Sequence, residues 1–111
     1  MVKDKQLTLD TDEYRVDREP ISGGSIDLKG ITIKVDDEID VNKGQWGNFY
    51  SLPVEYLNDA GEWVKGVINF THRGLFKLVT ANYTRLLGQE ALLCGEGTGV
   101  NRKYTITLIK A

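Results

Sequence analysis

The sequence predicts a mostly β domain, a small barrel of five strands with one helix between the third and fourth strands. Three observations lead to this prediction. Apolar and polar residues alternate with the period of two that half-buried strands show, over most of residues 26–70 and again over 103–110. The period changes to that of a helix once, between Phe70 and Leu75. The chain has 111 residues, the length of a single domain.

The beginning of the chain differs in composition from the rest. Residues 1–24 are polar and acidic and end in Pro20 and two glycines, which predicts a flexible arm or one short strand beside a domain of residues 25–111. In that domain, alternating apolar residues from Ile26 to Val35 predict the first strand. The alternation breaks at Gly30, which indicates a bulge there.

An acidic segment and a hairpin follow. The residues from Asp36 to Gly44 are rich in Asp, Asn and Gly and predict a loop. The second strand is expected from Gln45 to Leu57, with Pro53 at an edge or a bulge because proline cannot donate a ladder hydrogen bond. Asn58–Glu62 has the composition of a hairpin loop, and the third strand is expected from Trp63 to Phe70.

One helix and two strands complete the prediction. Apolar residues from Leu75 onward recur at helical spacing, so we expect a helix over residues 73–87, with Thr71 as its N-cap and Gly88 just past its end. Two strands, 91–95 and 103–110, follow and are joined by a glycine-rich loop. This order of elements is the layout of the OB-fold, a partly open Greek-key barrel whose helix covers one end.

The composition argues against several classes of protein. No apolar run approaches the ~20 residues of a membrane span, and the first residues lack the apolar core of a signal peptide, so a cytoplasmic protein is expected. Cys94 is the single cysteine and is expected to be a buried free thiol. His72 is the single histidine and is expected to cap the helix or lie on the surface. With one residue of each kind, no zinc site and no activated catalytic pair is expected, nor any cofactor.

Charge is unevenly distributed along the chain. The net charge of −2 argues against strong, non-specific binding of duplex DNA. Residues 1–63 contain 14 acidic and 7 basic side chains, whereas residues 64–111 contain 2 acidic and 7 basic ones. The first part therefore has a net charge of −7 and the second of +5. Folding either brings the basic part to one face or leaves its charges scattered over the surface.

Seven residues are candidates for binding a single strand of nucleic acid. Proteins of this kind combine aromatic rings, on which bases stack, with basic groups along the phosphates. Trp46, Phe49 and Trp63 are out of phase with the expected core, so they either stack on bases or lie under loops or at a subunit contact. The basic candidates lie in or beside the same strands and at the start of the last one: Lys43, Lys65, Arg102 and Lys103.

Three segments of the chain resemble the small OB-fold single-stranded DNA-binding proteins of phages and archaea. They are Gly44–Val54, Gly66–Phe70 and Asn101–Ile106, and the resemblance extends over about residues 26–110. It implies binding on the face of the second and third strands, between the loop before the second strand and the loop before the last. On this chain, these places hold the seven candidates named above.

The expected function is sequence-tolerant, non-catalytic binding of single-stranded DNA or RNA. A homodimer and contacts with replication or recombination proteins are further expectations, and no membrane partner is expected. The alternative is a protein-interaction module on the same barrel, in which Trp46 and Trp63 contact a partner or a second copy.

Overall fold

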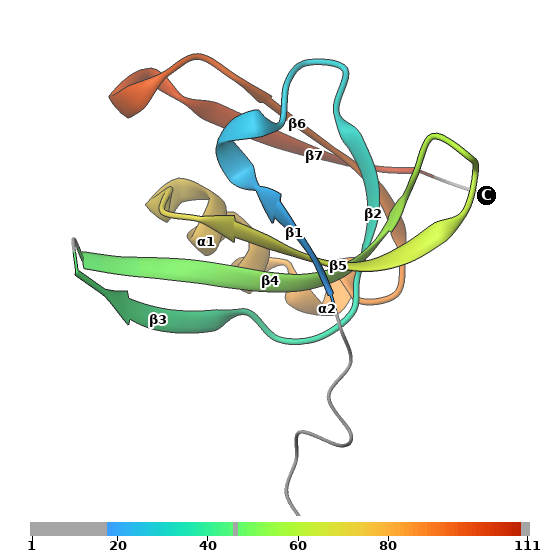
Figure 1. The fold of residues 1–111 in the computed structure, drawn as a ribbon, viewed down its shortest axis with the longest axis horizontal. Helices are drawn as coiled ribbons and strands as arrows, with labels where there is room; N and C mark the ends of the chain where they lie inside the picture. Colours follow the sequence, from blue (N-terminus) through green and yellow to red (C-terminus); the bar gives the residue numbers. More distant parts are fainter. Residues whose placement is uncertain (1–17, 46, 110–111) are drawn as a thin grey trace, which may run out of the picture.

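The computed structural model describes residues 18–45 and 47–109. These residues form a mostly β fold with two α-helices and two short 3-10 helices (Figure 1). In chain order, the elements are β1 (Glu19–Ser22), η2 (Gly23–Ser25), β2 (Ile31–Val35), β3 (Asp40–Gly44), β4 (Gly47–Leu57), β5 (Trp63–Phe70), α1 (Arg73–Ala81), α2 (Tyr83–Leu86), β6 (Glu90–Glu96), η3 (Gly99–Asn101) and β7 (Lys103–Leu108).

The strands of the described chain form one sheet of seven strands. Its order is β1-β5-β4-β2-β6-β7, and β3 pairs with β4 beside this path. β1 runs parallel to β5, whereas every other pair is antiparallel. Figure 1 shows β2 joining two halves of the sheet, with β4 and β5 in one half and the β6–β7 hairpin in the other. The expected β-rich fold is confirmed, but the sheet is not closed into a barrel among the described residues.

The core lies between the inner face of this curled sheet and α1. The core side chains of β2, β4, β5 and β6 are at most 7% exposed there, and α1 adds Leu75 and Val79. Burying each such side chain contributes about 1.5–3 kcal/mol. At the end of the core, Tyr50 stacks on Phe76 with 4.4 Å between ring centroids. Since neighbouring residues of a strand point to opposite faces, this packing turns the alternate residues of β4 and β5 outward.

β3 forms in a segment predicted to be a loop. Asp40–Gly44 pairs with the first residues of β4, so that Val41 lies opposite Tyr50 and Asn42 opposite Phe49. The prediction was wrong here because the segment has the composition of a turn. The first residues of β4 extend past the end of β2, and their backbone groups need a hydrogen-bonding partner. β3 supplies that partner.

The first predicted strand begins later than expected. Residues 25–30 are not a strand, and Gly30 precedes β2 instead of forming a bulge within it. Its φ of 78° and the hydrogen bond from its N–H to Asp27 Oδ1 (3.2 Å) make it part of a turn. Cys94, predicted to be buried, is half-buried beside this turn.

The single helix predicted over residues 73–87 is divided into α1 and α2. Asn82 has φ −118° and ψ 17°, outside the helical region, and its side-chain amide donates to the Leu78 carbonyl at 2.9 Å. His72, not Thr71, is the N-cap of α1, because its Nδ1 accepts from the Leu75 N–H at 3.0 Å. Of the two roles expected for His72, capping or a surface position, the structure confirms capping. Neither helix of the described residues is long and apolar enough to cross a membrane.

Gly30→Ala should destabilise the fold more than Gly61→Ala does. Both glycines have a φ of 78°, where an alanine costs about 1–2 kcal/mol. A Cβ at Gly61 would meet nothing, whereas at Gly30 it would lie 2.7 Å from Cys94 Sγ and 2.8 Å from the Leu93 carbonyl oxygen. We expect Gly30→Ala to lose about 1–3 kcal/mol more of unfolding free energy in urea denaturation. Equal losses for the two variants would contradict this packing.

Candidate nucleic-acid interface

One face of β4 and β5 is turned away from the core and from both helices. Tyr50, Leu52 and Val54 of β4 are buried, so the residues between them point outward. Antiparallel partners lie on the same side of a sheet, which extends this assignment from β4 to β5. The resulting surface, called the outer face below, consists of Phe49, Ser51, Pro53, Glu55, Leu57, Trp63, Lys65, Val67 and Asn69.

The two aromatic residues of the outer face lie near its opposite ends. Trp63 pairs with Leu57, which is eight residues along β4 from Phe49. At about 3.3 Å per residue, this places them about 26 Å apart along the strand. Phe49 is 37% exposed and Trp63 is half-buried. Stacked nucleotides are about 3.4 Å apart, so about eight of them match this length.

Trp63 has a basic neighbour that the sequence reasoning did not select. The Nζ of Lys34 lies 4.2 Å from the centre of the Trp63 ring, a cation–π contact. Lys34 pairs with Glu55 across β2 and β4, so it shares the outer face. Its position between Ile33 and Val35 showed that it points away from the core. Only the pairing of β2 with β4 brings it to Trp63.

A chain of polar side chains crosses the outer face next to Phe49. Asn42 Nδ2 donates to Ser51 Oγ at 3.1 Å, and Ser51 Oγ donates to Asn69 Oδ1 at 2.8 Å. These bonds link β3, β4 and β5 and hold the three side chains in place. These bonds do not use the Asn69 amide N–H groups or the Asn42 amide oxygen, which are donors and acceptors of the kind that a base edge pairs with. None of the three residues stood out in the sequence.

Lys65 is held at the other side of the face by an ion pair. Asp36 Oδ2 accepts from Arg18 at 2.7 Å and from Lys65 at 3.3 Å. Arg18 also donates to the carbonyl oxygens of Val54 and Gly66, each at 3.2 Å. The hydrogen bond from Arg18 lowers the pKa of Asp36; burial opposes this effect and Lys65 adds to it. The Asp36 carboxylate therefore neutralises part of the Lys65 charge.

Two of the predicted residues at the β3–β4 turn are not on the described outer face. Lys43 pairs with Asn48, which places it on the opposite side of the β3–β4 ribbon from Phe49. Trp46 lies outside the described residues. Of the three predicted aromatic residues, the structure thus brings Phe49 and Trp63 to one face.

Arg102, predicted to bind phosphate, is instead bound by the protein. Its guanidinium donates to the carbonyl oxygens of Gly23 (3.0 Å), Gly97 (3.1 Å) and Ile26, and to the Tyr104 hydroxyl (3.1 Å). These bonds tie the glycine-rich β6–β7 loop to η2 and the turn after it. They leave the guanidinium little capacity for a phosphate, since four of its five N–H donors are used.

Lys103 is exposed but lies away from the other candidates. It pairs with Glu96 across β6 and β7, and β7 is separated from β5 by β4, β2 and β6 in the sheet order. The basic end of the last strand is therefore not next to Trp63 within the sheet. The positive charge of the second part of the chain is spread over different elements.

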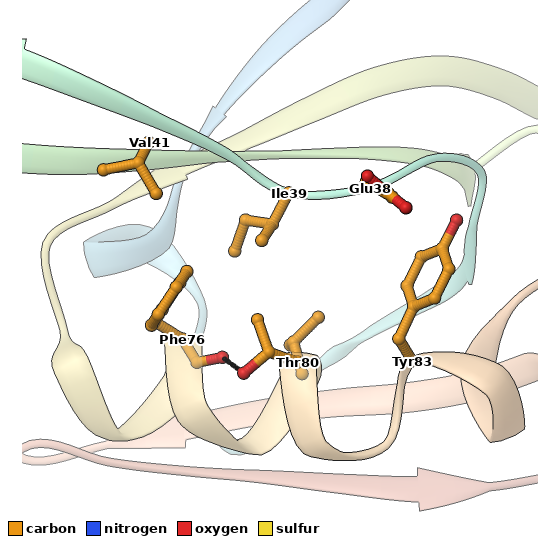
Figure 2. Close-up of a pocket in the computed structure, with 7 residues that line it drawn as sticks. Glu38, Ile39, Val41, Phe76, Thr80 and Tyr83 are labelled. Carbon is orange, nitrogen blue, oxygen red and sulfur yellow. Dashed lines mark hydrogen bonds between the residues drawn. The ribbon is translucent and has the colours of Figure 1, made fainter.

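A cavity of about 340 Å³ lies between α1 and the segment that leads into β3 (Figure 2). Figure 2 shows Ile39 and Phe76 lining its middle, with the Glu38 carboxylate and the Tyr83 hydroxyl at one end. Partial burial raises the pKa of Tyr83, and so do the nearby charges of Asp37, Glu38 and Asp36. This negative end would repel a phosphate, so the cavity does not extend the candidate interface.

No family model, curated protein or solved structure matches this chain. Within residues 18–45 and 47–109, no three His, Cys, Asp or Glu side chains gather in a way that could hold a metal ion. The geometry of the outer face is therefore the basis for assigning a function.

Arg102→Ala should destabilise the fold, whereas Lys103→Ala should not. Removing the guanidinium leaves the Ile26 carbonyl oxygen without its donor and takes one of three donors from the Gly23 carbonyl oxygen, which costs about 1–3 kcal/mol. Truncating the neighbouring exposed lysine should change the unfolding free energy by less than about 0.5 kcal/mol. Arg102→Lys should recover little stability, because one ammonium group cannot replace the planar fork. Urea denaturation of the three variants measures this, and a parent-like Arg102→Ala would refute the structural role.

Asp36 should make the stability depend on pH. Its pKa in the folded protein is below the usual 3.8, so its ionised form stabilises the fold above about pH 3.8. This stabilisation is lost as the pH falls through the lowered pKa. Asp36→Asn should therefore be less stable than the parent near neutral pH, with a difference that shrinks toward zero in strong acid. Asp59→Asn, in the exposed β4–β5 loop, is the control; a difference for Asp36→Asn that does not change with pH would contradict the ion pair.

Proposed function

We propose that this chain is an OB-fold domain that binds single-stranded nucleic acid, DNA or RNA, on the outer face and without catalysis. The observation that carries the proposal is the combination of groups on one face that neither helix of the described residues covers. Phe49 and Trp63 offer rings for base stacking, the Asn42–Ser51–Asn69 chain offers hydrogen bonds, and Lys34 and Lys65 offer positive charge. This is the combination with which single-strand binders hold their ligand.

The strand order supports the fold part of the proposal. The path β5-β4-β2-β6-β7 is the order in which the five strands of an OB-fold are hydrogen-bonded, and α1 stands between β5 and β6 in the chain. β1 lies beside β5 at one edge of the open sheet, and β7 forms the edge at the other end of the path. OB-folds bind oligonucleotides on the face of their second and third strands, which here are β4 and β5.

Stacking contributes more to the proposed binding than charge does. Lys34 and Lys65 share the outer face with Glu55 and lie near Asp36, so the local field is weak. Base stacking contributes about 1–3 kcal/mol per aromatic ring. The two described rings could therefore supply roughly 2–6 kcal/mol of binding free energy.

Trp63→Ala should weaken the binding of oligo(dT) by about 5- to 150-fold, the equivalent of about 1–3 kcal/mol for one stacked base. Fluorescence anisotropy with a labelled oligonucleotide of about 12 nucleotides, longer than the ~26 Å face, measures the change. Leu28→Ala is the matched control, because Leu28 is 68% exposed and lies in a loop outside the outer face.

In a Trp46→Phe background, the emission of Trp63 should also be quenched by the same oligonucleotide. Parent-like affinity of Trp63→Ala, together with unchanged emission at saturation, would refute the stacking role. If the parent binds no oligonucleotide at any salt concentration, the alternative, a protein-interaction module, becomes the better account of the exposed rings.

The salt dependence should be shallow. Each single-strand phosphate contact contributes about 0.7 to the slope of log affinity against log salt, so Lys34 and Lys65 predict a magnitude of about 1.4. Lys34→Ala with Lys65→Ala should remove most of this slope, whereas Lys43→Ala with Lys103→Ala should leave it unchanged. If the slope is lost in the Lys43→Ala, Lys103→Ala variant and kept in the Lys34→Ala, Lys65→Ala variant, the nucleic acid does not bind on the outer face.

A further inference from the structure

A second surface of this protein, at the edge strand β7, has unpaired backbone groups. β7 pairs with β6 on one side only. The Ile109 N–H donates to the Glu90 carbonyl at 2.9 Å, and backbone groups alternate in direction along an antiparallel strand. The N–H and C=O groups of Tyr104, Ile106 and Leu108 therefore point away from β6. Within residues 18–45 and 47–109, none of them has a backbone partner.

This edge lacks the features with which proteins protect exposed strands. Residues 104–109 contain no charged residue, no proline and no glycine. Edge strands are normally protected by charges, proline, bulges or a covering element, because an unprotected edge pairs with another strand. The opposite edge of the same sheet, β1, begins with Glu19 and Pro20 and follows that rule. The contrast between the two edges indicates that β7 has a partner strand.

An apolar groove runs beside the unprotected edge. Ile106 and Leu108 of β7 form one wall, and Leu78, Asn82, Arg85 and Leu86 of the two helices form the other, around a hollow of about 190 Å³. Leu108 is 46% exposed and Leu78 is 36% exposed. A strand added to β7 would extend the sheet beyond this groove, and every second side chain of that strand would point toward it.

We propose that β7 pairs in an antiparallel manner with β7 of a second copy, which joins two sheets into one across a two-fold axis. Antiparallel pairing of a strand with itself gives both copies the same contacts, as a two-fold interface requires. Ile106 and Leu108 supply apolar side chains for the partner's groove, and no like charges meet along 104–109. The outer face of β4 and β5 is not used, so the dimer does not depend on nucleic-acid binding.

Sedimentation velocity over a wide range of protein concentration tests the dimer. The parent should be dimeric, and Leu108→Lys should weaken its self-association at least tenfold, because it places a charge beside the joined edges. Leu28→Lys makes the same change at a more exposed leucine outside the groove and should leave the dimer intact. A parent that is monomeric at all concentrations, or a dimer that Leu108→Lys does not weaken, would overturn the proposal.

Amide hydrogen exchange distinguishes a lost interface from a lost fold. The N–H groups of Tyr104, Ile106 and Leu108 should be protected in the dimeric parent and exchange fast in Leu108→Lys. Those of Thr105 and Thr107, which point to β6, should be protected in both proteins. Protection of the outward N–H groups in a monomeric parent would mean that the chain covers its own edge, and the proposal would fail.

Discussion

The antiparallel register between β4 and β5 determines which side chains are buried and which can meet a ligand. It places Leu52 opposite Ile68 in the core and, on the other side of the sheet, Ser51 opposite Asn69. A slip of one residue would turn the buried set outward, so the hydrophobic core itself enforces the register. The same alternation that buries Tyr50 leaves Phe49 exposed, and the candidate interface is thus a consequence of core packing.

Arg102 shows how charge in a sequence and charge on a surface can differ. The second part of the chain has an excess of basic residues, but its best-placed guanidinium binds backbone carbonyls and closes the β6–β7 loop onto η2. Lys65 forms an ion pair with Asp36, which neutralises part of its charge. The face that remains is nearly balanced in charge and carries its aromatic rings on a regular sheet. Such a face suits a ligand held by stacking more than one held by phosphate contacts.

Alternation along the sequence predicted much of this fold, since the hairpin around Asn58–Glu62 and the outward phase of Phe49 and Trp63 depend on local pattern alone. The prediction failed where contacts with other segments of the chain determine the local structure. β3 forms because the backbone groups at the start of β4 require hydrogen-bonding partners. The predicted helix is interrupted at Asn82, whose side-chain amide donates to the Leu78 carbonyl. Lys34 joins the site only through the pairing of β2 with β4. No periodicity indicates which carbonyl oxygens a guanidinium such as that of Arg102 will meet.

The central claim is that single-stranded nucleic acid lies along the outer face. The most direct measurement is an amide-resolved NMR titration of the protein with oligo(dT). The account predicts that the largest chemical-shift changes fall on Phe49, Ser51, Trp63 and Asn69 and on the indole N–H of Trp63. Changes confined to the cavity between Glu38 and Tyr83 or to β7, with the outer face unaffected, would contradict it.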